Sequence, residues 1–208
     1  MSTHHCLKLP LCEQDVRAVA LGDTVSLAGE IVVTIGLPTH QRIAEYLRED
    51  KALPIELHGG AFLHLSCYND EGADGPQALY LGTTTSTRFN AFMPSFIRGY
   101  GLRLVGGKGG LDEECALAMQ ETGCVYLSFL GGSTALMSQA LRRVVDVQWT
   151  DLISQFRLIK LQVEDLGPAT VAIDAHGNSL YANLRRNADE RLSGIVAKLN
   201  ADRTNPPR

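Results

Sequence analysis

Three segments rich in glycine and hydroxyl residues hold the side chains best suited to binding a small anion. They are residues 82–88 (GTTTSTR), 106–110 (GGKGG) and 131–134 (GGST). Glycine lets a ligand approach the backbone closely, and the N–H groups at the start of a helix attract anions. Arg88 can grip a carboxylate with two hydrogen bonds, and Lys108 can add a point charge beside it. The segments therefore predict a site for a small carboxylate or phosphate; the simpler alternative is that each merely turns the chain.

Spacing excludes two better-known sites. Residues 106–110 do not form the phosphate-binding loop G-x-x-x-x-G-K-[ST], because a glycine follows Lys108. Residues 131–134 lack the G-x-S-x-G turn that presents a nucleophilic serine. Neither a nucleotide-hydrolysis site nor a serine-hydrolase site is therefore expected.

Each of the three segments lies between an apolar run and a helical pattern. Three strand–loop–helix units in series are typical of a parallel sheet covered by helices. In such sheets ligands bind beyond the carboxyl ends of the strands, where the loops lead into helices. The expected strands are residues 78–81, 102–105 and 124–130, and the expected helices are about 90–98, 111–123 and 135–144.

The flanking segments predict a second layer of strands. We expect strands in residues 25–35, 61–66 and parts of 145–182, with a helix from Pro38, an irregular arm over 1–10 and an exposed turn over 67–76. The fold class is α/β, with a βα core that carries the Gly/Thr-rich loops and packs on a β-layer. We expect this domain to span residues 1–182, followed over 183–208 by a polar amphipathic helix and a loose tail.

Composition and cysteine spacing argue against several classes of protein. Hydrophobic residues make up 45% and charged residues 20%, with a formal net charge of −4, which is not the basic balance of a nucleic-acid-binding protein. The five cysteines include no C-x-x-C pair, so neither a disulfide framework nor a self-contained metal or cluster site is expected. Cys115 and Cys124 are predicted to be buried. We find no secretory signal and no apolar run of membrane-spanning length, and expect a cytoplasmic protein.

Several segments resemble, in the same order, one known family. Residues 82–88, 106–110, 163–165 and 173–181 resemble the C-terminal part of class I fumarases. They also resemble the separate beta subunit of tartrate dehydratases and of two-subunit fumarases. Residues 27–33, 125–127 and 147–149 fit as well, so the resemblance covers about residues 8–182 without large gaps.

The resemblance implies an enzyme with a partner. The family reversibly removes water from a short hydroxy-dicarboxylate, of the malate/fumarate or tartrate/oxaloacetate type. Its beta part is a swivelling β/β/α domain that closes over a [4Fe–4S] cluster held by the alpha subunit. This chain would then hold no cluster of its own and would act in a hetero-oligomer, in which the pair can also self-associate.

The resemblance also implies roles for individual residues. Thr84 matches the base that removes the proton next to the leaving hydroxyl, Arg88 the clamp on a substrate carboxylate, and Lys108 the lysine of the glycine-rich loop. A free hydroxyl is too weak a base near neutral pH, so the alkoxide needs nearby cations such as Lys108 and Arg88. Thr85, Gly107 and His40 are the further candidates for substrate binding.

One position departs from the family pattern. The family commonly has an Arg-Asp pair shortly before the histidine that His40 matches, and here Gly36 stands in place of that arginine. Either the substrate differs from the usual dicarboxylate or another residue, such as Arg42, compensates. His40 itself either contacts substrate or is structural at the start of its helix. The other candidates, His58, His64 and His176, are interpreted as structural.

Three functions remain open at this point. The first is the catalytic beta subunit of a hydro-lyase. The second is a non-catalytic module that binds a small carboxylate. The third is an isomerase or aldolase-like enzyme in which Lys108 forms a Schiff base. The presence of Thr84, Arg88 and Lys108 together favours the first, whereas Gly36 keeps the second open.

Overall fold

The computed structural model describes residues 2–72 and 75–204, and its centre is a mixed sheet. Seven strands lie in the order β1-β2-β3-β6-β7-β9-β8, and β9 pairs with β2 as well as with β7. The second pairing curls the sheet back on itself, so that it encloses a core. The strands are β1 (His4–Lys8), β2 (Thr24–Val33), β3 (Ala61–Leu63), β6 (Leu104–Gly107), β7 (Val125–Ser128), β8 (Leu141–Gln148) and β9 (Leu158–Ile173).

The parallel strands end together at one edge of the sheet. Strands β1, β2, β3, β6 and β7 run parallel, whereas β8 and β9 are antiparallel to their neighbours. The register aligns Val33, Leu63, Gly106 and Leu127 across four strands. The chain segments that follow these residues therefore leave the sheet side by side, which is where ligands bind in such folds.

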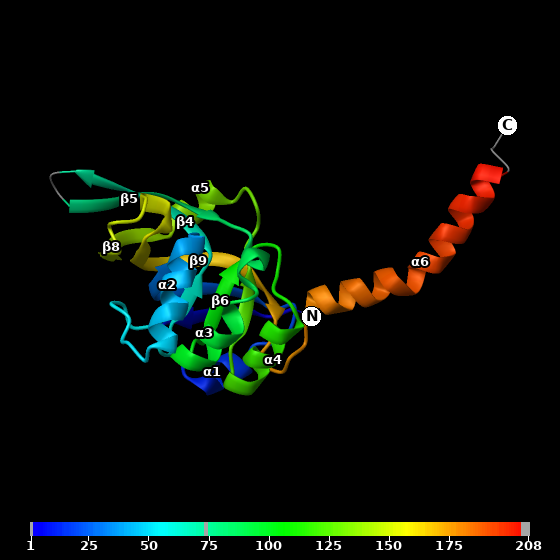
Figure 1. Cartoon of the computed structure of the whole chain (residues 1–208), viewed down its shortest axis with the longest axis horizontal. Coiled ribbons are helices and arrows are strands. Elements are labelled where there is room, and N and C mark those ends of the chain that lie inside the picture. The colour runs from blue at the N-terminus through cyan, green and yellow to red at the C-terminus, as the bar shows by residue number, and fades with distance from the viewer. Residues whose placement is uncertain (1, 73–74, 205–208) are drawn as a thin grey trace.

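Three helices cover the outer face of the sheet (Figure 1). They are α2 (Leu37–Arg48), α3 (Met93–Tyr100) and α4 (Glu113–Thr122), and the short helices α1 (Glu13–Arg17) and α5 (Thr134–Gln139) lie elsewhere on the body. Ile43, Phe96 and Met119 belong to one buried cluster with Phe62 and Tyr126 of the sheet. This cluster is the core between the sheet and the helices.

Helix α4 occupies most of the helix expected over residues 111–123. The Asp112 carboxylate accepts the N–H of Cys115 over 3.1 Å, and Gly123 follows the last turn with φ 70°. An acidic N-cap and a left-handed glycine satisfy the free backbone groups at the two helix ends.

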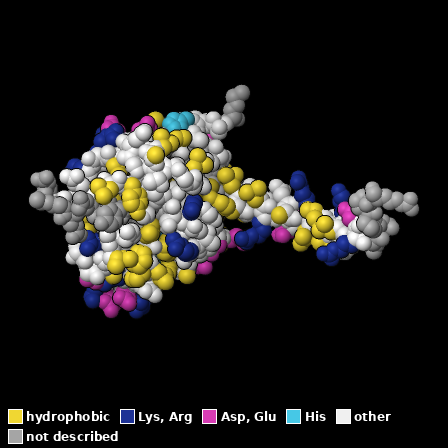
Figure 2. Space-filling view, turned by 90° about the horizontal axis from the view of Figure 1, so that it is seen from above, with side chains coloured by type: hydrophobic (Ala, Val, Ile, Leu, Met, Phe, Trp, Pro, Cys, Tyr) yellow, Lys and Arg dark blue, Asp and Glu magenta, His cyan; other side chains and the backbone are white. Residues whose placement is uncertain are grey.

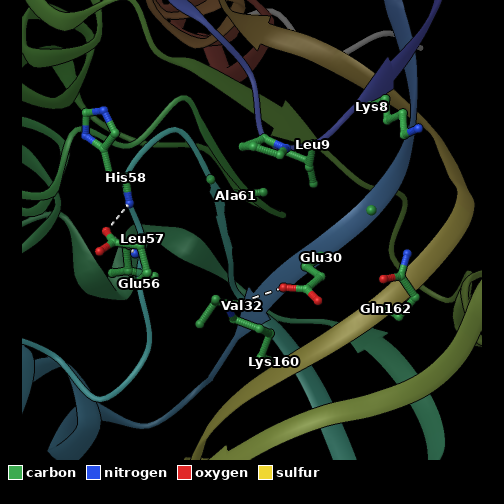
Figure 3. A pocket seen from close by; sticks show the side chains of 13 residues that line it. Lys8, Leu9, Glu30, Val32, Glu56, Leu57, His58, Ala61, Lys160 and Gln162 are labelled. Carbon is green, nitrogen blue, oxygen red and sulfur yellow. Dashed lines mark hydrogen bonds and ion pairs between the residues drawn. The ribbon is translucent and has the colours of Figure 1, made fainter.

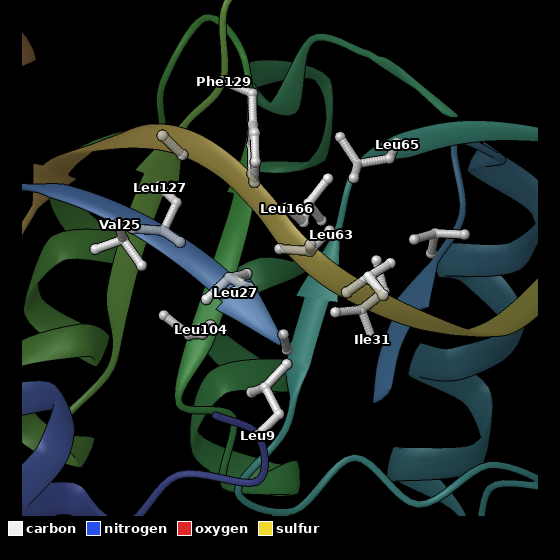
Figure 4. Close-up of a cluster of buried hydrophobic side chains, with 14 of the residues drawn as sticks. Leu9, Val25, Leu27, Ile31, Leu63, Leu65, Leu104, Leu127, Phe129 and Leu166 are labelled. Carbon is white, nitrogen blue, oxygen red and sulfur yellow. The ribbon is translucent and has the colours of Figure 1, made fainter. Parts of the chain in front are cut away.

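A second core lies inside the curled sheet. Figure 4 shows Leu27 of β2, Leu63, Leu104 and Leu127 of the parallel strands, and Leu166 of β9 meeting there. Strands β3, β6 and β7 thus have one buried cluster on each face, which is why their residues are almost all apolar. The layers are sheet, sheet and helix, and the predicted α/β class is confirmed.

A hairpin leaves the sheet between His64 and Thr84. It consists of β4 (Leu65–Gly72) and β5 (Gly75–Thr83), which pair only with each other. The Thr84 N–H donates to the His64 carbonyl over 3.0 Å, so the hairpin returns the chain to the place it left. The expectations of an exposed turn over 67–76 and of a parallel strand over 78–81 are therefore wrong. Residues 73–74 lie outside the described residues.

Other local expectations fail because a distant strand supplies backbone partners. Residues 4–8, expected to be irregular, pair with residues 24–28 as β1. The helix expected over 135–144 ends at Gln139, because residues 141–148 pair with β9 as β8. The strand expected over 61–66 divides at His64. Propensity is a weak signal, and long-range pairing overrides it here.

The last helix, α6 (Leu180–Thr204), projects from the body (Figure 1). Its apolar residues Leu184, Leu192, Ile195 and Leu199 are 53–66% exposed. Figure 2 shows yellow apolar and dark-blue basic side chains side by side along the projecting helix. The division at residue 182 stays a prediction, and residues 205–208 lie outside the described part. None of the helices in the described ranges is long and apolar enough to cross a membrane.

A leucine-to-alanine substitution should lower stability much more in the body than in α6. Leu127→Ala opens a cavity in the inner core and should lower the free energy of unfolding by about 2–5 kcal/mol. Leu192→Ala removes an exposed side chain and should change it by less than about 0.5 kcal/mol. Urea denaturation of dilute protein measures both. A loss above about 1 kcal/mol for Leu192→Ala would show that α6 packs on the body.

Candidate functional site

The first two Gly/Thr-rich loops are joined backbone to backbone at the carboxyl edge of the sheet. The Lys108 N–H donates to the Thr84 carbonyl over 2.9 Å, and the Ser86 N–H donates to the Lys108 carbonyl over 2.8 Å. The Thr87 hydroxyl adds a hydrogen bond of 2.9 Å to the Gly109 carbonyl. Residues that are 24 positions apart along the chain, Thr84 and Lys108, are thereby held on adjacent backbone segments.

The third loop lies against the other two. The Thr83 hydroxyl donates to the Leu130 carbonyl over 3.2 Å. A Cβ placed on Gly82 would lie 3.1 Å from Oγ1 of Thr134, and one placed on Gly131 would lie 3.9 Å from Cδ of Lys108. The structure therefore brings together the three segments that the sequence singled out.

Arg88 and Thr84 are in direct contact. The Arg88 Nη2 donates to Oγ1 of Thr84 over 3.1 Å, and its Nε donates to the Thr85 carbonyl over 3.4 Å. The guanidinium also lies over the Phe89 ring, 5.5 Å from its centre. Arg88 is exposed and Lys108 is half-buried, and within the described ranges neither pairs with a carboxylate. Two cations without counter-charges on adjoining loops can bind an anion.

A buried polar group lies beneath these loops. His40, His64 and Ser86 are all 0% exposed. The His40 Nε2 lies 3.3 Å from Nε2 of His64, and the His64 Nδ1 lies 2.8 Å from Oγ of Ser86. The Tyr126 hydroxyl donates to Oγ of Ser86 over 2.9 Å. Ser86 connects this buried group to the loop that carries Thr84 and Arg88.

Burial keeps both histidines uncharged near neutral pH. Desolvation lowers the pKa of His40 to about 4, against the raising effect of its hydrogen bond to the Gly36 carbonyl, and the Arg88 charge lowers it further. Desolvation also lowers the pKa of His64 well below its usual value, with smaller contributions from His40 and Arg88. His40 is further packed face to face on Phe89, with ring centres 3.8 Å apart.

Two of the predicted substrate-binding residues are buried inside this chain. His40 has no exposed surface, and its Nδ1 lies 2.7 Å from the Gly36 carbonyl, which favours the structural role at the start of α2 over direct contact with a substrate. Gly107 is also buried, and a Cβ there would collide with Oγ of Ser86. Its lack of a side chain is therefore explained by internal packing. Thr85 is half-buried and holds Arg88 through its carbonyl.

The position of Gly36 is closed by a neighbouring turn. A Cβ there would lie 2.7 Å from Cβ of Phe156, in the 3₁₀ turn η2 (Ser154–Phe156). Arg42, the predicted substitute, makes two hydrogen bonds of 2.9 and 2.7 Å to the exposed Asp151 and stacks on Trp149. Its guanidinium is thus engaged elsewhere in this chain.

Sequence reasoning missed two members of the buried group. The sequence predicts only a structural role for His64 and none for Tyr126. In the structure His64 contacts both His40 and Ser86, and Tyr126 contacts Ser86. The signal for His64 was its place directly after the apolar run 61–63, because the residue that follows a parallel strand faces the ligand edge. The prediction for Cys115 and Cys124 is confirmed, since both are buried.

A hollow on the body lies away from these loops. It measures about 400 Å³ and lies beside Ala61, at the amino end of β3 (Figure 3). Three of its charged side chains have partners within the chain: Lys160 lies 3.3 Å from Glu30, and Glu56 accepts the N–H of His58 over 2.8 Å. Thr84 and Lys108 lie past the opposite end of β3, so this hollow is not part of their site.

Comparison with known proteins points to one family. A family model described as fumarase C-terminus matches residues 3–184. The L(+)-tartrate dehydratase subunit beta of Escherichia coli K12 is 30% identical over 193 residues, which are 93% of this chain and 94% of that protein. A Methanocaldococcus jannaschii protein named "Putative L(+)-tartrate dehydratase subunit beta" is 31% identical over 187 residues, 89% of this chain and 95% of that protein. A "Putative fumarate hydratase class I" of Geobacillus stearothermophilus is 29% identical over 189 residues, 90% of this chain but 35% of that protein.

The buried histidines should make stability depend on pH. Both are neutral in the folded state but titrate near pH 6.5 when unfolded, so the unfolded chain binds more protons as the pH falls from 6.5 towards 4. Stability should therefore decrease over that window, by on the order of 2 kcal/mol per buried histidine between pH 7.5 and 5. Urea denaturation at the two pH values measures the loss. His58→Gln, which removes an exposed histidine, should leave it unchanged, whereas equal stability of the unsubstituted chain at both pH values would contradict the proposed charge states.

Proposed function

The chain belongs to the fumarase C-terminus family, and from that membership we propose that it is the beta subunit of a two-subunit hydro-lyase that dehydrates a small hydroxy acid. The observation that carries the proposal is the contact of Arg88 with the Thr84 hydroxyl, beside Lys108 on the adjoining loop. The family relatives named for tartrate dehydratase and fumarate hydratase are hydro-lyases, which fixes the reaction class.

We assign Thr84 as the base that removes the substrate proton. Its hydroxyl oxygen accepts a hydrogen bond of 3.1 Å from the Arg88 guanidinium. A positively charged donor stabilises the oxyanion that forms when the hydroxyl loses its proton. Lys108, held beside Thr84 by backbone hydrogen bonds, adds a second positive charge. Proton removal next to a carboxylate builds negative charge on the substrate, which these cations also favour.

The same cations would bind the substrate carboxylate. One terminal nitrogen of Arg88 is engaged by Thr84, and the exposed remainder of its planar group is free to contact a carboxylate. Lys108 would contribute a single ammonium contact. Thr85 and Gly107 stay predicted participants through their backbone, and we propose that His40 acts from beneath the loop without touching the substrate.

The described residues of this chain do not form a site that fits a metal cluster. Its described part contains no group of three or more Cys, His, Asp or Glu side chains arranged to hold a metal ion. Cys67, Cys115 and Cys124 are buried apart in the two cores. We therefore propose that the [4Fe–4S] cluster belongs to a partner alpha subunit, with which this chain forms a hetero-oligomer, and that this chain supplies the base and the carboxylate contacts. A cytoplasmic location stays a prediction.

The closed position at Gly36 bears on the choice of substrate. Because Phe156 packs against Gly36, position 36 has no room for an arginine side chain. Arg42 is paired with Asp151. The proposal accordingly includes hydroxy acids other than malate and tartrate. A panel of hydroxy acids, tested anaerobically on this chain co-expressed with its alpha subunit, identifies the substrate. Carboxylate binding without turnover of any of them would favour a binding module.

Loss of the Thr84 hydroxyl should abolish proton removal. In the complex with the alpha subunit, Thr84→Ala should lower kcat by about 10²–10⁴-fold with little change in KM, because the base is lost and the carboxylate contacts remain. Thr84→Ser retains the hydroxyl and should keep most of the activity. Steady-state kinetics on intact complexes decides, and full turnover by Thr84→Ala would remove this residue from the role of base.

Arg88 should affect both binding and turnover. Arg88→Met removes the carboxylate contact and the hydrogen bond to Thr84, so kcat/KM should fall by about 10²-fold or more, with a rise in KM. Arg98→Met, which removes a surface arginine paired with Glu121, serves as the matched control and should leave both constants unchanged. An unaltered KM in Arg88→Met would contradict the carboxylate clamp.

A further inference from the structure

A continuous chain of buried hydrogen bonds runs beneath the proposed site. It begins at the Gly36 carbonyl, passes through His40 and His64 to the Ser86 hydroxyl, and reaches the Tyr126 hydroxyl; the successive distances are 2.7, 3.3, 2.8 and 2.9 Å. Its three central side chains are 0% exposed, so each of their polar atoms must be satisfied within the protein.

Only one arrangement of protons satisfies every link. The Gly36 carbonyl can only accept, so the His40 Nδ1 carries a proton and, in the neutral ring, Nε2 does not. The His64 Nε2 must then donate to the His40 Nε2, which leaves the His64 Nδ1 as an acceptor. Ser86 therefore donates its hydroxyl proton to His64 and receives one from Tyr126. All donors point the same way along the chain.

The backbone and side chain of Ser86 link the buried hydrogen bonds to the loops that carry Thr84 and Lys108. The Ser86 N–H donates to the Lys108 carbonyl over 2.8 Å, and Ser86 lies two residues from both Thr84 and Arg88. A Cβ on Gly107 would lie 3.1 Å from Cβ of His64 and would collide with Oγ of Ser86. Gly107 is thus seated directly on the buried chain, one residue before Lys108.

The far end of the chain returns to the same loop. Burial raises the pKa of the Tyr126 hydroxyl, and the backbone of Gly110, at the end of the lysine loop, is among the nearby groups that lower it. The buried chain therefore packs against residues 106–110 at Gly107 and lies near them at Gly110. Movement of Ser86 would disturb the segment that presents Lys108.

An additional proton cannot be accommodated. At 3.3 Å the two Nε2 atoms share a single proton, and a second would set two N–H donors against each other. The charged group that faces the pair is Arg88 of the 3₁₀ turn η1 (Ser86–Phe89), whose charge opposes protonation. The remaining neighbours are the neutral side chains Tyr126 and Ser86, and phenylalanine rings of β3, η1 and α3. No carboxylate of the described residues hydrogen bonds to either ring.

We propose that His64 and Ser86 are positioning residues, which hold the Thr84 and Lys108 loops in place through this one-directional chain and release them when a histidine is protonated. The catalytic consequence rests on the proposed function, but the positioning itself does not. The chain makes the geometry of the site depend on the proton count of two side chains that never meet the substrate.

The tautomers can be read directly from the isolated full-length chain. In ¹⁵N-resolved NMR of the histidine rings at pH 7.5, His40 should be protonated at Nδ1 and His64 at Nε2, both neutral. Substitution Ser86→Ala should shift the His64 ring signals and leave those of the exposed His4 unmoved. A His40 ring protonated at Nε2, or a charged ring at either position, would overturn the proposal.

Amide hydrogen exchange tests the positioning itself without any turnover. In Ser86→Ala, the amides of Thr84, residue 86 and Lys108, which donate to this region, should exchange at least about tenfold faster, whereas those of α4 should not change. Ser86→Thr retains the hydroxyl and should restore protection. Ser95→Ala, on an exposed face of α3, is the matched control. Unchanged protection of the three amides in Ser86→Ala would overturn the proposal.

The active complex supplies a readout that a merely structural serine would not move. Ser86→Ala should lower kcat about tenfold or more, with KM changed less, and should move the acid limb of the kcat profile to higher pH. If the unsubstituted complex turned over no hydroxy acid, the proposed function would fail. The NMR and exchange results would still show whether the buried hydrogen bonds position the two loops. Loss of activity without a shift of the acid limb would overturn the link between protonation and loop position.

Discussion

The double pairing of β9 is the constraint on which the rest of the structure depends. By bonding to β2 along most of its length and to β7 at its end, β9 closes a ring of five strands with a core inside. The closure holds β3, β6 and β7 between two buried layers, so their ends cannot shift relative to one another. The loops at that edge inherit this rigidity. Such a scaffold holds Thr84, Arg88 and Lys108 on adjoining backbone segments.

Burying the polar side chains beneath the loops costs desolvation free energy. That cost favours the one arrangement of protons in which every donor meets an acceptor. Removing two imidazoles and a hydroxyl from water is unfavourable unless each donor meets an acceptor. Here every link is met, and only with both histidines neutral and their protons in one order. The same group explains why residue 107 is a glycine, because Ser86 and His64 occupy the space of a side chain. Loop geometry and histidine charge are therefore coupled through packing.

In the proposed function, a partner subunit completes the site of this chain. Arg88 is exposed, Lys108 is half-buried, and the described part of the chain has no group of metal ligands and no carboxylate paired with either cation. Catalysis by a threonine alkoxide requires that water be excluded, because water would screen the cations that stabilise it. This is a physical reason for the proposed alpha subunit to cover the loops. Helix α6 begins at Leu180, close to the end of the family match at residue 184, and the ring of Tyr181 in its first turn packs against Gly110 of the lysine loop.

Local composition was enough to predict the α/β class, the helix α4, the three Gly/Thr-rich loops and their meeting at one edge. These features depend on neighbouring residues or on the general geometry of parallel strands. Pairing across long separations was not predictable in the same way: β1, β8, the β4–β5 hairpin and the split at His64 each depend on a partner far along the chain. The sequence alone determined which residues could carry charge and hydroxyl chemistry. Only the tertiary structure decided that Arg88 contacts Thr84, that Gly36 is closed by Phe156, and that His40, His64 and Ser86 are buried as one chain, because burial and hydrogen-bond partners exist only once distant segments have packed.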